Sequence, residues 1–208
     1  PNLPAERLLY TPNFASGSEY QVGFARGATV TLDNLEPLDT WPEVFQGREV
    51  FLRLDLGQGA GHHRHVRTAG NQSKFGIPAE ALPDLRQRLE ALDIRVTGLH
   101  SHSGSGIQTP EAWARAAAAL ARVAEDLPDV EVLDLGGGLG VPERSDQSDF
   151  DLAALDRLLA AFRQSQPRYR LWLEPGRYLV AQAGVLLARV NQTKRKRDKN
   201  FVGVDAGM

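Results

Sequence analysis

Short apolar segments alternate with longer amphipathic segments along most of this chain, and this rhythm constrains the fold more than any other feature. The short segments are apolar throughout instead of alternating with polar residues, which is typical of strands buried on both faces of a parallel sheet. Six such strands are expected, at residues 8–12, 29–34, 49–55, 94–102, 130–138 and 170–177.

Three amphipathic segments between the later strands are expected to be helices, at residues 78–93, 109–128 and 149–167. The second has Thr109 as its expected N-cap and Pro110 at its first helical position, and Pro128 ends it. The third begins at an aspartate and ends before Pro167. Strands that alternate with helices predict βαβ units and an α/β fold.

Polar or conformationally special residues follow the ends of several expected strands. A (β/α)8 barrel gathers functional residues at the carboxyl ends of many strands, whereas a doubly wound sheet concentrates them at one switch point. We therefore predict a partial (β/α)8 TIM-type barrel with about six of the eight βα units. The residues at these strand ends are Asp33, Asn34, Asp55, His100, His102, Gly136–Gly138 and Glu174–Arg177.

The rhythm changes after Arg177. Residues 183–193 and 200–205 are expected to be antiparallel strands joined by a basic turn at 194–199. We interpret that turn as a solvated hairpin tip and not as a nucleic-acid patch. The predicted domains are therefore residues 1–180, an incomplete barrel, and residues 181–208, the start of a β-rich domain.

Composition excludes several classes of function. The formal net charge of -2 gives no support to nucleic-acid binding, and the absence of cysteine excludes disulfides, zinc-thiolate sites and thiol nucleophiles. It also fits a reducing compartment, so a cytoplasmic location is expected. No apolar stretch approaches the ~20 residues that a membrane span needs, and no secretory signal is visible.

The segment GLHSHSGSGI, residues 98–107, places two histidines and a turn of small residues after an expected strand. His100 and His102 have the spacing of a metal site, as in amidohydrolase barrels, but no histidine follows them to complete a ligand set. Alternatively, the Gly-Ser turn cradles the phosphate of a cofactor. The glycine-rich segment 57–78 has the length of a lid or of a plain surface loop, and it holds the remaining histidines, His62, His63 and His65.

Two further segments are candidates for anion binding. Gly136–Gly138 allow a tight turn whose N–H groups point at an anion, although a turn without ligand fits equally well. Glu174 leaves a buried strand, where a carboxylate needs a cation or donor. Arg177 offers a planar fork for phosphate or carboxylate, and the alternative is a local ion pair between Glu174 and Arg177.

Together these segments resemble the fold-type III pyridoxal-phosphate (PLP) decarboxylases, a family of diaminopimelate, ornithine and arginine decarboxylases related to alanine racemase. HSHSGSG is similar to the family's H-x-G-S turn, LDLGGGLG to its phosphate loop, EPGRYLV to its EPGR strand and VGVDAGM to the strand that re-enters its β-domain. HVRTAGNQSKFGI is most similar to diaminopimelate decarboxylases, including versions fused to aspartokinase. The resemblance covers nearly the whole chain.

The resemblance implies a PLP site. His102 stacks on the pyridine ring and Glu174 pairs with the pyridine nitrogen, so these two are the implied catalytic residues. Arg177 also contacts substrate, no metal is implied, and His100 is interpreted as a structural residue that points the other way along its strand. The implied cofactor-binding set is Arg53, His102, Ser105, Gly136, Gly137, Gly138, Glu174, Gly176 and Arg177.

The implied reaction is decarboxylation of meso-2,6-diaminopimelate to L-lysine by a homodimer. PLP is an electron sink for the carbanion, and a carboxylate beside its ring nitrogen keeps that nitrogen protonated. The related racemases use an arginine there, so Glu174 favours decarboxylation. The alternatives are a decarboxylase of ornithine or arginine, a non-catalytic PLP- or phosphate-binding protein and, less favoured, a metal-dependent hydrolase.

One departure from the family concerns its Schiff-base lysine, which lies in a Y-x-V-K-A-N-like stretch that has no counterpart here. The four lysines are Lys74, Lys194, Lys196 and Lys199, and Lys74 corresponds to a loop lysine of the family. We therefore expect an internal fragment of the enzyme, without the first two βα units and most of the β-domain, that is inactive alone. Its open barrel edges are expected to pair with another chain or to make it aggregation-prone.

Overall fold

The computed structural model describes residues 3–57 and 73–207, so His62, His63 and His65 lie outside the described residues. Internal contacts divide the chain into two units, residues 1–178 and residues 179–208. The assignment of residues 1–180 to a PLP-binding barrel domain and of residues 181–208 to a β-domain stays a prediction.

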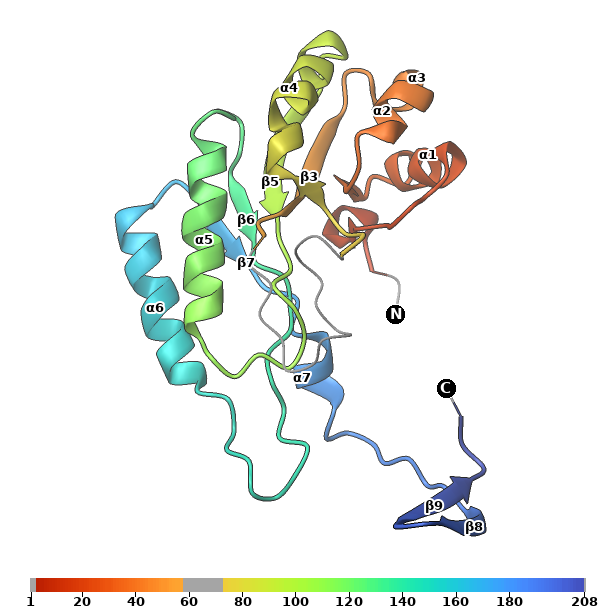
Figure 1. The fold of residues 1–208 in the computed structure, drawn as a ribbon. Helices are drawn as coiled ribbons and strands as arrows, with labels where there is room; N and C mark the ends of the chain where they lie inside the picture. The colour runs from red at the N-terminus through yellow and green to blue at the C-terminus, as the bar shows by residue number, and fades with distance from the viewer. Residues whose placement is uncertain (1–2, 58–72, 208) are drawn as a thin grey trace. The chain divides into compact units, whose positions relative to one another are not determined.

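A curved parallel sheet forms the centre of the first unit (Figure 1). Its six main strands follow one another in sequence order, each parallel to the next. These strands are β1 (Leu9–Tyr10), β2 (Thr29–Leu32), β3 (Glu49–Asp55), β5 (Arg95–His100), β6 (Val132–Asp134) and β7 (Arg170–Trp172). A short unpredicted strand, β4 (Ile77–Pro78), pairs parallel to β3. Among the described residues β1 and β7 end the strand order, as the predicted six-stranded partial barrel requires.

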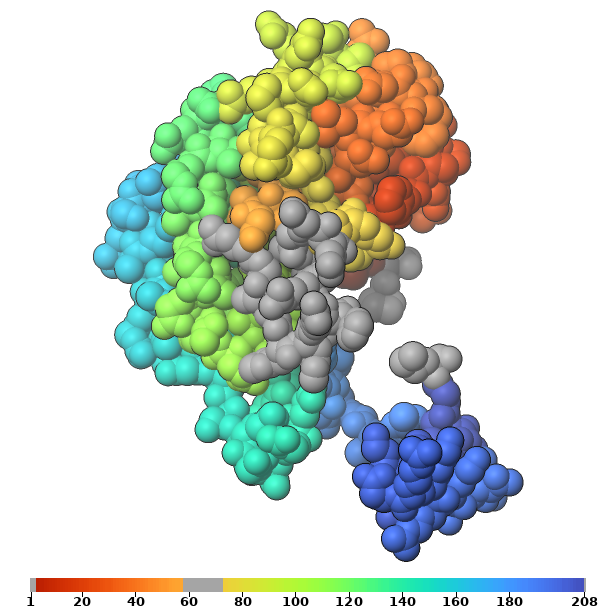
Figure 2. All heavy atoms as spheres, viewed as in Figure 1, coloured from red at the N-terminus to blue at the C-terminus, as the bar shows by residue number. Residues whose placement is uncertain are grey.

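Helices connect the strands, and α4, α5 and α6 lie along the outer side of the sheet (Figure 1). In the space-filling view, the atoms coloured yellow to green, which include α4 and α5, form a large part of the visible surface of the first unit (Figure 2). The helices are α1 (Gly17–Ala25), α2 (Glu36–Thr40), α3 (Pro42–Phe45), α4 (Leu82–Ala91), α5 (Glu111–Ala124), α6 (Leu152–Ser165) and α7 (Gly176–Val180), with 3-10 turns at Ala5–Arg7 and Ala79–Ala81. None of the described helices is both long enough and apolar enough to cross a bilayer.

The three predicted helices are present, but the expected ends of α5 are wrong. Its N-cap is Pro110 and not Thr109, and no side-chain hydrogen bond caps the helix. The Thr109 carbonyl accepts only a three-residue turn bond, from the Ala112 N–H at 3.1 Å. The helix ends at Ala124, four residues before Pro128, because the next amides form shorter turns, such as Leu127 N–H to the Ala124 carbonyl at 3.1 Å. Small alanines on its buried face let α5 pack closely on β5 and β6.

Strands β5, β6 and β7 end earlier than predicted. Strand β6 stops at Asp134 because Gly136 and Gly138 take φ values of +66° and +93°, which are incompatible with an extended strand. The expected strand 170–177 ends at Trp172, and its EPGR part leads into α7. The carboxyl ends of these strands therefore continue as loops that turn across the edge of the sheet.

The second unit contains the antiparallel hairpin of β8 (Val190–Lys196) and β9 (Lys199–Val204). The hairpin was expected, but its boundaries were wrong: β8 starts at Val190 and not at residue 183, and the basic residues up to Lys196 belong to the strand. The turn is only Arg197 and Asp198, and Arg197 has the positive φ of 57° that two-residue hairpin turns require.

Helix α1 begins with a capping box. The Ser16 N–H donates to Glu19 Oε2 at 2.8 Å, and Ser16 Oγ accepts from the Glu19 N–H at 3.4 Å. We expect Ser16→Ala to lower the free energy of unfolding by about 1 kcal/mol, measured by urea denaturation. Gln21→Ala, at an exposed position of the same helix, leaves both bonds intact and should cost much less. Equal losses in the two variants would contradict this role of the cap.

Candidate active site

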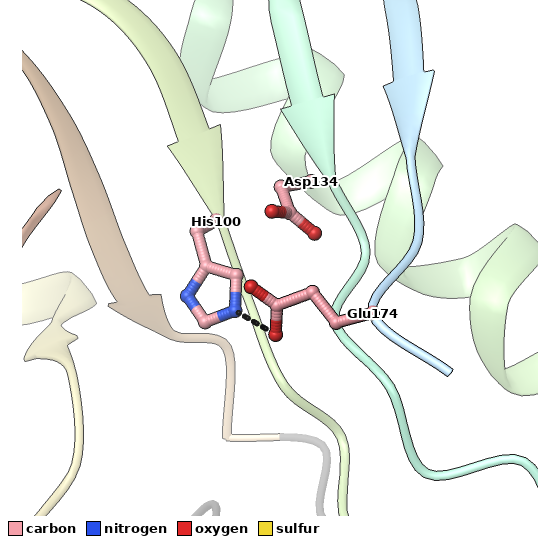
Figure 3. A group of neighbouring side chains, drawn as sticks. All are labelled: His100, Asp134 and Glu174. Atoms are coloured by element: carbon pink, nitrogen blue, oxygen red, sulfur yellow. Dashed lines mark ion pairs between the residues drawn. The ribbon is translucent and has the colours of Figure 1, made fainter. Parts of the chain in front are cut away.

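The carboxyl ends of β5, β6 and β7 bring one histidine and two carboxylates together (Figure 3). His100 is the last residue of β5 and pairs in register with Asp134, the last residue of β6. Asp134 pairs in turn with Trp172, the last residue of β7, and Glu174 follows two residues later. Parallel pairing of neighbouring strands therefore places the three side chains at one edge of the sheet.

The cluster of His100, Asp134 and Glu174 is buried on one side and open on the other. His100 and Asp134 are each 1% exposed, whereas the Glu174 side chain is 41% exposed and lines a cavity of about 620 Å³. His100 Nε2 lies 3.5 Å from Glu174 Oε2, and the potential ligand atoms of the three side chains lie within 4.8 Å of one another. The expectation that His100 points away from the site is therefore wrong.

The two carboxyl groups have opposite pKa shifts. Burial raises the pKa of Asp134 to about 6, with a further contribution from the negative charge of Glu174. The interaction with His100 lowers the pKa of Glu174 against the effect of burial. In mild acid, Asp134 is therefore protonated while Glu174 carries the negative charge.

His102 lies two residues beyond β5 and presents a neutral ring near neutral pH. Its Nδ1 accepts a hydrogen bond from the Gly137 N–H at 3.2 Å. Burial, reinforced by the positive charge of Arg53, lowers the pKa of His102 to about 4. An uncharged, flat imidazole is thus available next to Glu174 and the glycine turn.

The glycine turn after β6 packs tightly against its neighbours. A Cβ atom on Gly137 would lie 2.1 Å from the Glu174 carbonyl oxygen, and one on Gly138 would lie 2.0 Å from the Gly104 carbonyl oxygen. The amide of Gly136 donates to Asp134 Oδ1 at 2.9 Å, and that of Gly137 donates to His102. Two of the three amides expected to face an anion therefore have protein acceptors in this structure.

Ser105 and Arg177 line a second cavity, of about 580 Å³, next to the glycine turn. The turn that contains Ser105 is joined to the glycine turn, because the Ile107 N–H donates to the Gly138 carbonyl at 2.9 Å. Arg177 Nη1 lies 3.9 Å from Glu143 Oε1, so among the described residues the ion-pair partner of Arg177 is Glu143 and not Glu174. Gly176 begins α7, and no atom of the described residues lies within 4 Å of a Cβ placed on it.

Arg53 brings a positive charge from β3 to the same edge of the sheet. It pairs in register with His100, and its guanidinium lies 4.5 Å from the centre of the Phe75 ring. Burial lowers the pKa of Arg53, and the negative charges of Asp33, Glu174 and Asp55 oppose that shift.

Sequence reasoning proposed Glu174 and His102 as site residues, which stays a prediction, and it missed Asp134, which the structure places beside Glu174. The available signal was an acidic residue inside the apolar segment VEVLDLGGG, where a carboxyl group must find a partner. The spacing of His100 and His102 is that of a metal site. Among the described residues, however, the side chains close enough together to hold a metal are His100, Asp134 and Glu174, without His102.

The donor set fits a phosphorylated aromatic cofactor without a covalent link. The neutral His102 ring, the Glu174 carboxylate and the Ser105 turn suit a ring, a ring nitrogen and an anion respectively. Lys74 is the one lysine that the sequence places in residues 1–178, and its Nζ lies over the rings of Phe14 and Phe75 at 5.6 Å and 5.2 Å.

Residues 2–181 match the family described as pyridoxal-dependent decarboxylase, pyridoxal binding domain. The chain belongs to this family. PLP is thus the cofactor of its family, and the predicted fold-type III resemblance is confirmed.

Diaminopimelate decarboxylases are among the proteins similar to the chain. The diaminopimelate decarboxylase of Methanothermobacter thermautotrophicus is 34% identical over 97% of this chain and 50% of its own length. A crystal structure of a diaminopimelate decarboxylase matches with a TM-score of 0.80 at 30% identity, covering 96% of this chain and 48% of that one. The M. jannaschii enzyme, solved with L-lysine, matches with a TM-score of 0.75 at 26% identity, covering 99% of this chain and 51% of that one. The chain therefore spans about half the length of these relatives.

Proposed function

We propose that this chain supplies the cofactor-binding part of a PLP-dependent diaminopimelate decarboxylase, which converts meso-2,6-diaminopimelate to L-lysine. The observation that carries the proposal is Glu174, whose lowered pKa keeps a negative charge at the carboxyl ends of the strands. The bound L-lysine of the M. jannaschii structure supports an amino-acid ligand of this class. A homodimer in the cytoplasm belongs to the same proposal and rests on the resemblance.

The side chains divide the work of such a site. When bound, PLP supplies an electron sink for the carbanion that remains after CO2 leaves. Glu174 holds a proton at the pyridine nitrogen by attraction between opposite charges. His102 offers its uncharged ring to the face of the pyridine. Arg53 directs positive charge toward the side of the cofactor ring that carries the phenolic oxygen.

Two of the proposed anion contacts, Ser105 and Arg177, line the second cavity. Ser105 and the turn at Gly136–Gly138 bind the phosphate, with Gly176 and Arg177 at the start of α7. Because the Gly136 and Gly137 amides donate to Asp134 and His102, the Gly138 amide is the donor that the turn offers to the phosphate. Arg177 also offers its guanidinium to a substrate carboxylate, for which a planar fork is well suited. In this structure the guanidinium is near Glu143, so substrate binding requires it to exchange that partner.

A non-catalytic PLP-binding protein is the second candidate. The observation that favours it is the absence of a lysine counterpart to the family's Schiff-base residue within the sequence. The reading frame that contains this chain separates the two candidates, since the decarboxylase proposal expects a Y-x-V-K stretch upstream. Ornithine or arginine as substrate would be revealed by turnover assays on the product of that frame.

Titration with pyridoxamine 5′-phosphate, which cannot form a Schiff base with lysine, tests cofactor binding by the chain itself. We expect saturable binding that His102→Ala weakens by about threefold to tenfold, the loss of one aromatic stacking contact. Glu131→Gln changes an exposed carboxylate paired with Arg170 and is expected to leave affinity unchanged. Absence of binding, or equal affinity in the parent chain and the His102 variant, would count against the proposed site.

A further inference from the structure

We propose that His100 and Asp134 are positioning residues that hold the Glu174 carboxylate in place, and that His100 favours its ionised form. The relevance of this role to catalysis rests on the proposed function. The arrangement itself is a property of the chain without cofactor, and it assigns a task to two buried polar side chains that the site described above does not otherwise use.

The strand pairing and burial of His100 hold it in place independently of its contact with Glu174. Its backbone belongs to β5 between β3 and β6, and its side chain is only 2% exposed. Neither ring nitrogen has a hydrogen-bond partner within normal geometry among the described residues, and Glu174 Oε2, at 3.5 Å from Nε2, is the ion-pair partner. A buried polar group without a partner is costly, so the contact with Glu174 offsets the burial of the imidazole.

Asp134, on the neighbouring strand β6, restricts the position of the Glu174 carboxylate. Its Oδ1 accepts the Gly136 N–H, which fixes the side chain, and its Oδ2 is buried without a hydrogen bond among the described residues. Figure 3 shows His100 and Asp134 both facing the Glu174 carboxylate. Glu174 also has its own N–H bonded to the Gly136 carbonyl at 2.9 Å, so backbone and side chain are both held.

The charges around Glu174 come from three strands and the loop after β5. His100 and His102 lie on β5 and its loop, Asp134 on β6 and Arg53 on β3. His100 favours the ionised form of Glu174, while a charged Asp134 opposes it. The open side of Glu174 faces the 620 Å³ cavity, so the fixed carboxylate directs its charge there.

The test is a pH titration of the cofactor-free chain labelled with [δ-13C]glutamate, in which loss of a resonance in Glu174→Gln identifies Glu174. We expect His100→Phe to raise the Glu174 midpoint by about one pKa unit or more, because the variant loses the ring N–H that favours the carboxylate. His100→Gln keeps an N–H donor near the position of Nε2 and should shift the midpoint by less than half as much. Asp134→Asn should abolish a second step of the Glu174 signal near pH 6.

Thr31→Val is the matched control, because Thr31 is a buried polar residue on β2, outside the cluster. Thermal melts identify variants that do not fold, and His100→Asn, whose amide is too short to reach Glu174, replaces the phenylalanine variant in that case. An unchanged Glu174 midpoint in the folded His100 variants would overturn the proposal, as would equal shifts in His100→Gln and His100→Phe. Since no cofactor is present, failure of pyridoxamine phosphate binding is a separate result that bears only on the proposed function.

Discussion

Replacing Gly137 with alanine is expected to destabilise the chain by about 2–3 kcal/mol, because the new methyl group has no space. Its Cβ would lie 2.1 Å from the Glu174 carbonyl oxygen, which is backbone and cannot rotate away. The same backbone is held by the bond from the Glu174 N–H to the Gly136 carbonyl. Relief of the clash therefore requires separation of the glycine turn from the end of β7.

Gly176→Ala is the control for this substitution, since a Cβ at that position has no neighbour within 4 Å in the part of the chain that the structure describes, and alanine favours helix formation in α7. We expect its free energy of unfolding to stay within about 0.5 kcal/mol of the parent value, measured by urea denaturation. Similar losses in the two variants would mean that the turn is loose enough to accept a side chain at Gly137.

Asp134→Asn is expected to stabilise the chain by about 2 kcal/mol at pH 8, because it removes a buried charge and keeps an oxygen to accept the Gly136 N–H. The folded-state pKa of Asp134 is raised to about 6 from 3.8. Above pH 6 the folded state therefore carries the full cost of the charge. That cost falls as the pH drops from 6 toward 4, where the folded state is protonated while the unfolded state is still ionised.

Urea denaturation of both proteins between pH 4 and pH 8 measures this difference. The gain from Asp134→Asn should decrease toward acid pH, while Asp129→Asn, at an exposed position, should change the free energy of unfolding by no more than about 0.5 kcal/mol at pH 8. His102, with its pKa lowered to about 4, makes the parent lose stability as the pH falls from about 6.5. This loss occurs in both proteins, so it cancels to first order in the comparison. A stability gain from Asp134→Asn that is constant with pH would contradict the presence of a buried charge at Asp134.

The strands were predictable because two-sided burial leaves a direct mark on the sequence, as in EVFLRLD of β3. The ends of elements were less predictable, because tertiary contacts decide them. Three glycines indicated a turn after β6, but the strand stops where Gly136 adopts a positive φ under the loop after β5, and that packing has no local mark in the sequence. Helix α1 did have a local signal, the capping box of Ser16 and Glu19, and it was missed.

The site was predictable where a residue type had a local reason to be unusual. Glu174 at the end of an apolar segment and the small residues around Ser105 are such cases. The contact of His100 with Glu174 spans two strands and depends on the register of β5, β6 and β7. The pairing of Arg177 with Glu143 likewise requires a loop whose path is set by packing and not by periodicity.

A crystal structure of the chain with pyridoxamine 5′-phosphate tests the central claim, that the carboxyl ends of β5, β6 and β7 form a PLP-type site. The account predicts the pyridine nitrogen within about 3 Å of a Glu174 carboxylate oxygen, the His102 imidazole against one face of the ring and the phosphate at Ser105. A complex in which the pyridine nitrogen lies away from Glu174 and the phosphate away from Ser105 would contradict it.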